Sequence, residues 1–304
     1  MKLMTELNQA IAQMFIQFRR AANLSQEELA DLAGVHRTYI SQMERALKMP
    51  TLATLFKICT ALNIKPNQAV TEIELLIALK TTVTYKLNLS TQIDCGFLVT
   101  SEHIEKASQQ TNEFLTTLPL SLYSSVDYKT ISSIIGAIFA QNLAVLVGAM
   151  VNPIEKGHPD IVPSQAIGST EEQLRNYPQG LEIKCTVGNI KTGANLRAGQ
   201  TRIADLTGLT WQAHHREVSA LMGLVWDFVQ ANHVFCYPKL TGAFYSNQLI
   251  ISDWGEISGT TGRNTKVTGM SGTGKAKMGA GWVVLLDQVE YQRTYAKLLK
   301  FNLD

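Results

Sequence analysis

A short segment near the N-terminus restricts the fold more than any other part of this sequence. Ser25 is followed three positions later by Glu28, the capping-box spacing in which each side chain binds the other residue's backbone N–H at a helix start. The helical pattern then continues over Gln26–Leu32 and stops at Gly34, the small residue that a tight turn requires. A second short helix is predicted over His36–Arg45. The sequence therefore predicts two short helices joined by a tight turn.

Further helices are predicted on both sides of this pair. Between Leu7 and Arg20 apolar residues recur at helical spacing, and two more helices are predicted at Leu52–Leu62 and Gln68–Leu79. Residues 1–80 are thus expected to form an all-α domain.

The segment from Arg19 to Pro66 resembles the Xre or lambda-repressor-like helix-turn-helix domain. The resemblance rests on the cap, on the turn glycine and on three apolar residues in register, Leu29, Val35 and Ile40. It implies that residues 1–80 bind double-stranded DNA, with the second helix of the motif in the major groove.

The same resemblance implies which side chains contact DNA. Gln26 would bind a phosphate at a helix N-terminus, whereas Arg37, Thr38 and Gln42 would face base edges in the major groove. Glu44 is expected to brace the domain rather than to read a base.

Residues that can perform chemistry gather in the stretch 157–189. Asp160 opens a short apolar run, and residues 181–185 then alternate with the period of a strand. Period two places Glu182 and Lys184 on one face of that strand. If the two strands are neighbours, two carboxylates and one ammonium converge at a sheet edge. Oxygen ligands of this kind suit Mg²⁺, which typically binds one or two carboxylates and keeps waters for a substrate phosphate.

This order of residues resembles the PD-(D/E)XK nuclease superfamily, with Asp160, Glu182 and Lys184 at its three motif positions. The resemblance implies that the two acids and the Ile183 carbonyl bind Mg²⁺, for which Mn²⁺ can substitute. Lys184 would orient or help to deprotonate the attacking water. The chain departs from the family where an acid is expected in the preceding helix, because Gln141 and Asn142 stand there.

The residues alone leave a structural alternative open, because Glu-x-Lys is common on solvated strand and helix faces. The apolar, strand-like surroundings of both halves and the N-terminal DNA-binding module favour the nuclease hypothesis. Together, the two resemblances predict an α+β multidomain protein. An all-α helix-turn-helix domain at residues 1–80 is followed by an α/β PD-(D/E)XK endonuclease domain with a central mixed sheet at residues 81–304.

Basic residues outside these motifs are further candidates for DNA contact. The formal net charge is only +2, but the region 182–216 is locally basic. A run with helical character, Ala194–Leu206, displays Arg197 and Arg202. The Gly-rich segment 255–281 is predicted to be a flexible arm that orders against DNA phosphates, with a solvated loop as the alternative. Its cations are Arg263, Lys266, Lys275 and Lys277.

Two motif-like features are interpreted as coincidental. Residues 269–275 imitate a phosphate-binding loop, but Ala276 stands where Ser or Thr would bind Mg²⁺. His214 and His215 are adjacent, so in regular structure they point to different faces and do not suggest a metal site.

Cysteine usage and hydropathy indicate a cytoplasmic protein that does not span a membrane. The 4 cysteines show no paired spacing, which argues against a zinc knuckle or a disulfide framework. The apolar stretch Ile131–Val151 approaches the length of a membrane span, but Gln141 and Asn142 at its centre favour a buried core helix.

These observations predict a type II restriction enzyme that hydrolyses double-stranded DNA to 5′-phosphate and 3′-hydroxyl ends. Such an enzyme is expected to act as a homodimer on palindromic sites and to have a DNA methyltransferase as functional partner. A transcriptional regulator of the Xre family, with a non-catalytic sensing or dimerisation domain, is the alternative. A repair or defence nuclease of another type is a third hypothesis.

Overall fold

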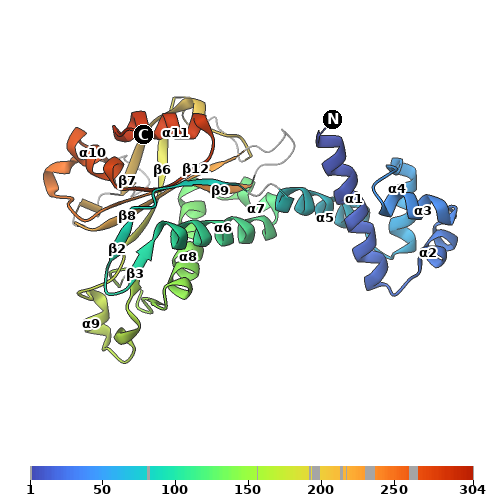
Figure 1. Ribbon diagram of the computed structural model, residues 1–304, viewed down its shortest axis with the longest axis horizontal. Helices are drawn as coiled ribbons and strands as arrows, with labels where there is room; N and C mark the ends of the chain where they lie inside the picture. Colours follow the sequence, from blue (N-terminus) through green and yellow to red (C-terminus); the bar gives the residue numbers. More distant parts are fainter. Residues whose placement is uncertain are drawn as a thin grey trace. The chain divides into compact units, whose positions relative to one another are not determined.

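The computed structural model describes residues 2–80, 83–155, 157–191, 193, 199–212, 215–216, 218–229, 237–259 and 266–303 (Figure 1). The chain divides after residue 82 into two compact units.

The N-terminal unit is all-α. Its helices are α1 (Lys2–Ala21), α2 (Gln26–Ala33), α3 (Arg37–Glu44), α4 (Leu52–Ala61) and α5 (Pro66–Lys80). The predicted cap is confirmed: Ser25 Oγ accepts a hydrogen bond from the Glu28 N–H at 3.1 Å, and Glu28 Oε2 accepts one from the Ser25 N–H at 2.7 Å. Gly34 ends α2 at a φ of 62°, the left-handed conformation that glycine adopts without strain. The turn between α2 and α3 therefore follows from the sequence.

One apolar core holds the five helices together. It contains Met14 and Phe15 of α1, Leu29 of α2, Ile40 of α3 and Ile58 of α4, all buried. These are the helix faces that the apolar spacing predicted. The burial of these side chains fixes the orientation of α3 relative to the other helices of this unit.

The C-terminal unit is built on a mixed sheet. In the described part of the chain the sheet has eight strands in the order β1-β12-β9-β8-β6-β7-β11-β10. β6 and β8 are parallel, and the other paired strands are antiparallel. The strands are β1 (Tyr85–Leu87), β6 (Ile183–Ile190), β7 (Leu206–Gln212), β8 (Leu221–Phe228), β9 (Pro238–Ser246), β10 (Trp254–Gly259), β11 (Lys266–Met270) and β12 (Trp282–Leu286).

Helices cover both faces of this sheet. Figure 1 shows α6 (Ser101–Thr117) and α8 (Tyr128–Leu146) on one face, and α10 (Gly272–Ala280) and α11 (Val289–Leu299) on the other. A short helix, α7 (Leu120–Ser125), joins α6 to α8. By length and composition α8 could cross a membrane, but here it packs against α6 and β6. It is a core helix, as predicted.

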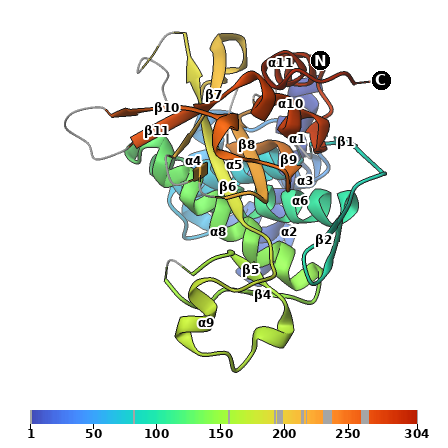
Figure 2. The same ribbon diagram turned by 90° about the vertical axis from the view of Figure 1, so that its left-hand side faces the viewer.

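A small subdomain interrupts the chain between α8 and β6. It holds a hairpin of β4 (Met150–Val151) and β5 (Ile161–Val162) and the short helix α9 (Glu171–Arg175), which Figure 2 shows together beyond one end of α8. Val162, Ala166 and Leu174 form its apolar core. A second hairpin, β2 (Gln92–Asp94) with β3 (Leu98–Thr100), precedes α6.

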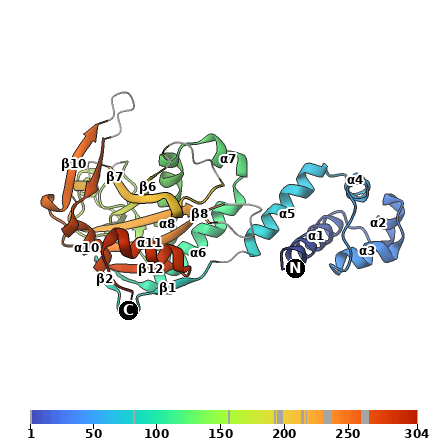
Figure 3. The ribbon, with the colours of Figure 1, turned by 90° about the horizontal axis from the view of Figure 1, so that it is seen from above.

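Two local predictions were wrong. The described part of the run 194–206 contains a 3-10 turn at Ile203–Asp205, and Leu206 already belongs to β7. The described residues of the Gly-rich segment 255–281 do not form a flexible arm: they contribute to β10, β11 and α10, and Figure 3 shows β10 at one margin of the sheet. Pairing of β11 with β7 supplies backbone hydrogen bonds that the local sequence does not reveal.

Candidate functional site

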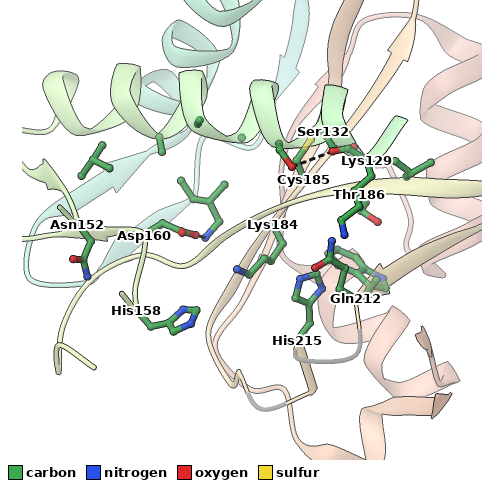
Figure 4. A pocket seen from close by; sticks show the side chains of 18 of the residues that line it. Lys129, Ser132, Asn152, His158, Asp160, Lys184, Cys185, Thr186, Gln212 and His215 are labelled. Carbon is green, nitrogen blue, oxygen red and sulfur yellow. Dashed lines mark hydrogen bonds between the residues drawn. The ribbon is translucent and has the colours of Figure 1, made fainter. Parts of the chain in front are cut away.

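The candidate site lies where β6 changes neighbours. Residues 183–186 pair with β8, whereas residues 187–190 pair with β7. The β7 side of the first half is therefore open, and a cavity of about 820 Å³ lies beside it. Figure 4 shows Asp160 and His158 at one end of this cavity, with Gln212 and His215 toward the other. α8, β6, β7, β11 and the segment before β5 line it.

Asp160 reaches β6 because the segment before β5 lies against it. Ile161 and Leu181 exchange both backbone hydrogen bonds, at 3.1 and 2.8 Å. Two residues further along, the Ile183 N–H donates to Asp160 Oδ2 at 2.7 Å. The two motif strands are thus neighbours, the condition on which the sequence prediction of a converging site depended.

The pKa of the Asp160 carboxyl is raised to about 6, first by burial and then by the negative charge of Glu182. The Lys184 ammonium, the Ile183 N–H and His158 act in the opposite direction. Asp160 is therefore ionised at neutral pH in spite of a second carboxylate nearby. A partly exposed carboxylate beside the buried Glu182 is an arrangement in which a divalent cation would relieve the mutual repulsion.

Glu182 and Lys184 lie on one face, as the strand period predicted. The Lys184 Nζ is 2.6 Å from Glu182 Oε1, and the Glu182 side chain is only 5% exposed. Lys184 pairs in register with Gly223, where an added Cβ would come within 2.6 Å of the Trp211 ring. Trp211 thus packs on the face that carries Lys184, which restricts the directions that the ammonium can take.

The oxygen donors at this edge suit Mg²⁺ or Mn²⁺. Asp160 and Glu182 supply carboxylates, and the Ile183 carbonyl points to the side of the strand to which its N–H points, toward Asp160. Within the described residues no group of three or more His, Cys, Asp or Glu residues is arranged to hold a metal ion. Mg²⁺ requires fewer protein ligands, because it typically keeps several waters. The donor set therefore fits an oxygen-seeking cation and does not fit structural zinc.

Two residues at this site were missed by the sequence reasoning. The His158 Nδ1 lies 3.1 Å from Glu182 Oε1, although 24 positions separate the two residues. Asn152 is buried, and its Nδ2 donates to the carbonyl oxygens of Pro159 at 3.1 Å and Leu174 at 2.8 Å. The position of His158 two residues before Asp160 was the only local signal.

The expected acid of the preceding helix has no counterpart among the α8 residues near the cavity. Gln141 lines the cavity, whereas the Asn142 Nδ2 donates to Thr111 Oγ1 of α6 at 3.2 Å. Asp127 is the N-cap of α8, where its carboxylate accepts from the Thr130 N–H at 2.7 Å.

Arg202 was wrongly predicted to contact DNA. Its side chain is buried, 4% exposed, and its Nη2 donates to the Trp226 carbonyl at 2.6 Å. Its Nε is 3.7 Å from Asp227 Oδ1, and the guanidinium lies over the Tyr128 and Trp226 rings. Arg202 is therefore a core cation that compensates Asp227.

The remaining basic candidates differ in their surroundings. Lys277 is not on a flexible arm: it lies in α10, and its Nζ is 2.6 Å from the buried Asp253 carboxylate. Lys275 is half-buried on the same helix, and Lys266 begins β11. Arg197 and Arg263 lie outside the described residues.

Two motif-like features remain, the segment 269–275 and the pair His214 and His215. Residues 272–275 are already helical, so residues 269–275 form no loop that could wrap a phosphate. His215 is buried beside the Trp211 and Trp254 rings, and His214 lies outside the described residues.

In the N-terminal unit, α3 presents the predicted base-reading residues on its first turns. Arg37 and Thr38 are exposed, and Gln42 is partly exposed. Glu44 braces the domain as predicted: its carboxylate accepts from Arg19 Nε at 2.6 Å and from Gln26 Nε2 at 2.7 Å. This triangle ties α1, α2 and α3 together and fixes the Gln26 amide at the N-terminus of α2.

Comparison with known proteins identifies this unit. Residues 16–68 match the family model described as Helix-turn-helix. The control protein C.SmaI of Serratia marcescens is 41% identical over 58 residues, which are 19% of this chain and 69% of that protein. The chain belongs to the helix-turn-helix family. Control protein C.BamHI of Bacillus amyloliquefaciens is 44% identical over 46 residues, 15% of this chain and 57% of that helix-turn-helix relative.

Solved structures also match part of the chain. The restriction-modification controller protein C.AhdI from Aeromonas hydrophila is 35% identical and covers 20% of this chain and 94% of that chain, with a TM-score of 0.20. The matched family model ends at residue 68, so it does not reach the mixed sheet.

The helix-turn-helix geometry gives a prediction about base reading. Arg37→Ala should weaken binding by about 1–3 kcal/mol at one base position and relax specificity there, because arginine can fork to guanine O6 and N7. Gln26→Ala should weaken binding similarly on all sequences, since a phosphate contact carries no base information. Binding to a randomised DNA library, sequenced before and after selection, would measure both effects.

The matched control is Arg45→Ala, which removes the same charge at the opposite end of α3. It should leave the sequence preference unchanged. An unchanged preference in Arg37→Ala would exclude Arg37 as a base reader.

Proposed function

We propose that this helix-turn-helix protein is a sequence-specific DNA endonuclease that requires Mg²⁺ or Mn²⁺. The proposal is carried by one observation, the convergence of Asp160, Glu182 and Lys184 at the open edge of β6. The helix-turn-helix domain on the same chain supports DNA as the substrate of such a site. The overall class is a type II restriction enzyme with a PD-(D/E)XK catalytic domain.

Each residue of the site has a role in this proposal. Asp160, Glu182 and the Ile183 carbonyl would hold the cation, which would lower the pKa of water and neutralise charge on the phosphate. Lys184 would donate a hydrogen bond to the attacking water, which orients it and helps to deprotonate it. The hydrogen bond from the Ile183 N–H holds one carboxylate oxygen of Asp160, a residue that lines the cavity, and leaves the other oxygen available to the cation. Burial excludes bulk water and strengthens these electrostatic interactions.

The products and partners follow from this class. Hydrolysis would leave 5′-phosphate and 3′-hydroxyl ends, and a homodimer would cut both strands of a palindromic site. A cytoplasmic location and a DNA methyltransferase that protects the host's own sites complete the proposal.

A second candidate function is transcriptional regulation without catalysis. The similarity to control proteins C.SmaI and C.BamHI supports this candidate better than it supports cleavage, because it concerns the DNA-binding unit. In that case the sheet unit would sense a ligand or dimerise, and the cavity of about 820 Å³ has the size of a small-molecule site.

Cleavage assays with defined metals separate these candidates. Purified protein should cut a long DNA with Mg²⁺ or Mn²⁺, whereas Ca²⁺ should support binding with little cleavage, because Ca²⁺ accepts looser geometry and activates water poorly. Activity should fall as the pH drops below about 6, because protonation of Asp160 removes a negatively charged ligand. Sequencing of the fragment ends would identify the site and the end chemistry.

Two results would reject the nuclease proposal. Cleavage that survives EDTA would exclude the metal mechanism. Specific DNA binding without cleavage under any of these metals, on DNA that carries the bound sequence, would leave the regulator as the function of the chain.

A further inference from the structure

His158 is a side chain at the candidate site that the roles described above do not use. Its Nδ1 lies 3.1 Å from Glu182 Oε1 and 3.3 Å from Glu182 Oε2. The His158 side chain is 47% exposed, whereas that of Glu182 is 5% exposed. His158 therefore connects a buried carboxylate to the mouth of the cavity that it lines (Figure 4).

The backbone around His158 is held on several sides. Its N–H donates to the Arg175 carbonyl at 3.0 Å, and its carbonyl accepts from the Tyr177 N–H at 2.8 Å. The preceding residue, Gly157, packs so closely on Asn152 that an added Cβ would lie 2.7 Å from the amide oxygen. The imidazole is thus presented to Glu182 from a fixed backbone.

Glu182 has two partners of different kinds in this structure. Lys184 Nζ lies 2.6 Å from Oε1, while His158 Nδ1 is within reach of both oxygens. A carboxylate accepts hydrogen bonds only, so the hydrogen on His158 must be at Nδ1. A cation that binds Glu182 competes with the Lys184 ammonium for the same oxygens. The Lys184 ammonium would then be released toward water, and the interaction with His158 would remain.

We propose that His158 is a positioning residue: its Nδ1–H holds Glu182 in place while that carboxylate exchanges Lys184 for a divalent cation. This inference rests on the proposed metal-dependent function. It extends that function because cation affinity would also depend on His158, a residue outside the three motif positions. Groups that orient metal ligands typically change metal affinity by about 10–100-fold when they are removed.

The test compares three substitutions in the full-length protein. His158→Ala removes the donor, His158→Asn keeps an amide donor at the position of Nδ1, and His158→Gln moves that amide to the position of Nε2. Mn²⁺ binding without DNA, measured by electron paramagnetic resonance titration, should weaken by about 10-fold or more in His158→Ala and His158→Gln. His158→Asn should recover most of the affinity. The Mg²⁺ concentration for half-maximal cleavage should change in the same order.

The Asn and Gln variants keep the test decisive if His158→Ala folds poorly, because both retain a polar amide and should have similar metal-free melting temperatures. Equal Mn²⁺ affinity in these two variants would overturn the positioning role. If the wild-type protein binds Mn²⁺ and cleaves DNA while His158→Ala does so equally well, the inference fails and the nuclease proposal stands. If the wild-type protein neither binds Mn²⁺ nor cleaves DNA, both fail.

Discussion

Asp160→Ala and Lys184→Ala are each expected to lower the cleavage rate by at least about 100- to 1000-fold while the protein remains folded. Asp160 is a cation ligand in the proposed site, and Lys184 acts on the attacking water. Neither side chain belongs to the apolar core, since Asp160 is partly exposed and Lys184 is 15% exposed. Single-turnover cleavage at saturating Mg²⁺ would measure the loss.

The control for this prediction is Glu171→Ala, which removes a carboxylate that is 61% exposed on the nearby helix α9. It should cut DNA at the wild-type rate. Asp160→Ala and Lys184→Ala should keep the specific DNA binding of the helix-turn-helix domain, because that unit is separate from the sheet. Full activity in either variant would remove that residue from the proposed mechanism.

Arg202→Ala should produce the largest loss of stability, about 3–5 kcal/mol in the free energy of unfolding. Burial raises the pKa of Asp227, and the Arg202 charge opposes that shift. Without Arg202, Asp227 keeps hydrogen bonds from Tyr291 and from the Phe228 N–H but has lost its buried counter-charge. Urea unfolding at neutral pH, read separately for each unit, would measure the difference.

Two comparisons test the reason for that loss. Arg175→Ala breaks an exposed ion pair with Glu171 and should cost less than about 1 kcal/mol. In Arg202→Ala the folded-state pKa of Asp227 should rise further above its unfolded value, so stability should recover as the pH falls through that range. A double variant, Arg202→Met with Asp227→Asn, should be more stable than Arg202→Ala. Equal stability of the two would argue against an uncompensated buried charge.

Features set by neighbouring residues could be predicted from this sequence. The Ser25–Glu28 cap and the Gly34 turn depend on contacts across three or four positions, and both were confirmed. The shared face of Glu182 and Lys184 follows from strand period alone. The adjacency of Asp160 to this strand was a condition of the prediction, and the sequence offered no independent test of it.

Features set by distant partners could not be predicted. Arg202 is buried because Asp227, 25 positions later, compensates its charge. The Gly-rich segment becomes β11 because β7, more than 50 positions earlier, pairs with it at Val267 and Gln212. His158 was overlooked for the same reason, because Glu182 gives it a role only in the folded chain. Contacts between residues far apart in the sequence, rather than local propensity, determine the burial of Arg202, the formation of β11 and the contact of His158 with Glu182.

The change of neighbours along β6 separates the strand that sets the register of the candidate site from the strands that wall its cavity. The half that bears Glu182 and Lys184 takes its register from β8, which is buried along its whole length, whereas the other half takes its register from β7. A slip of one residue in the first half would turn both side chains to the opposite face. The register with β8 therefore sets which way Glu182 and Lys184 face, and the ribbon β7-β11-β10 forms the opposite wall of the cavity through Trp211 and Val267.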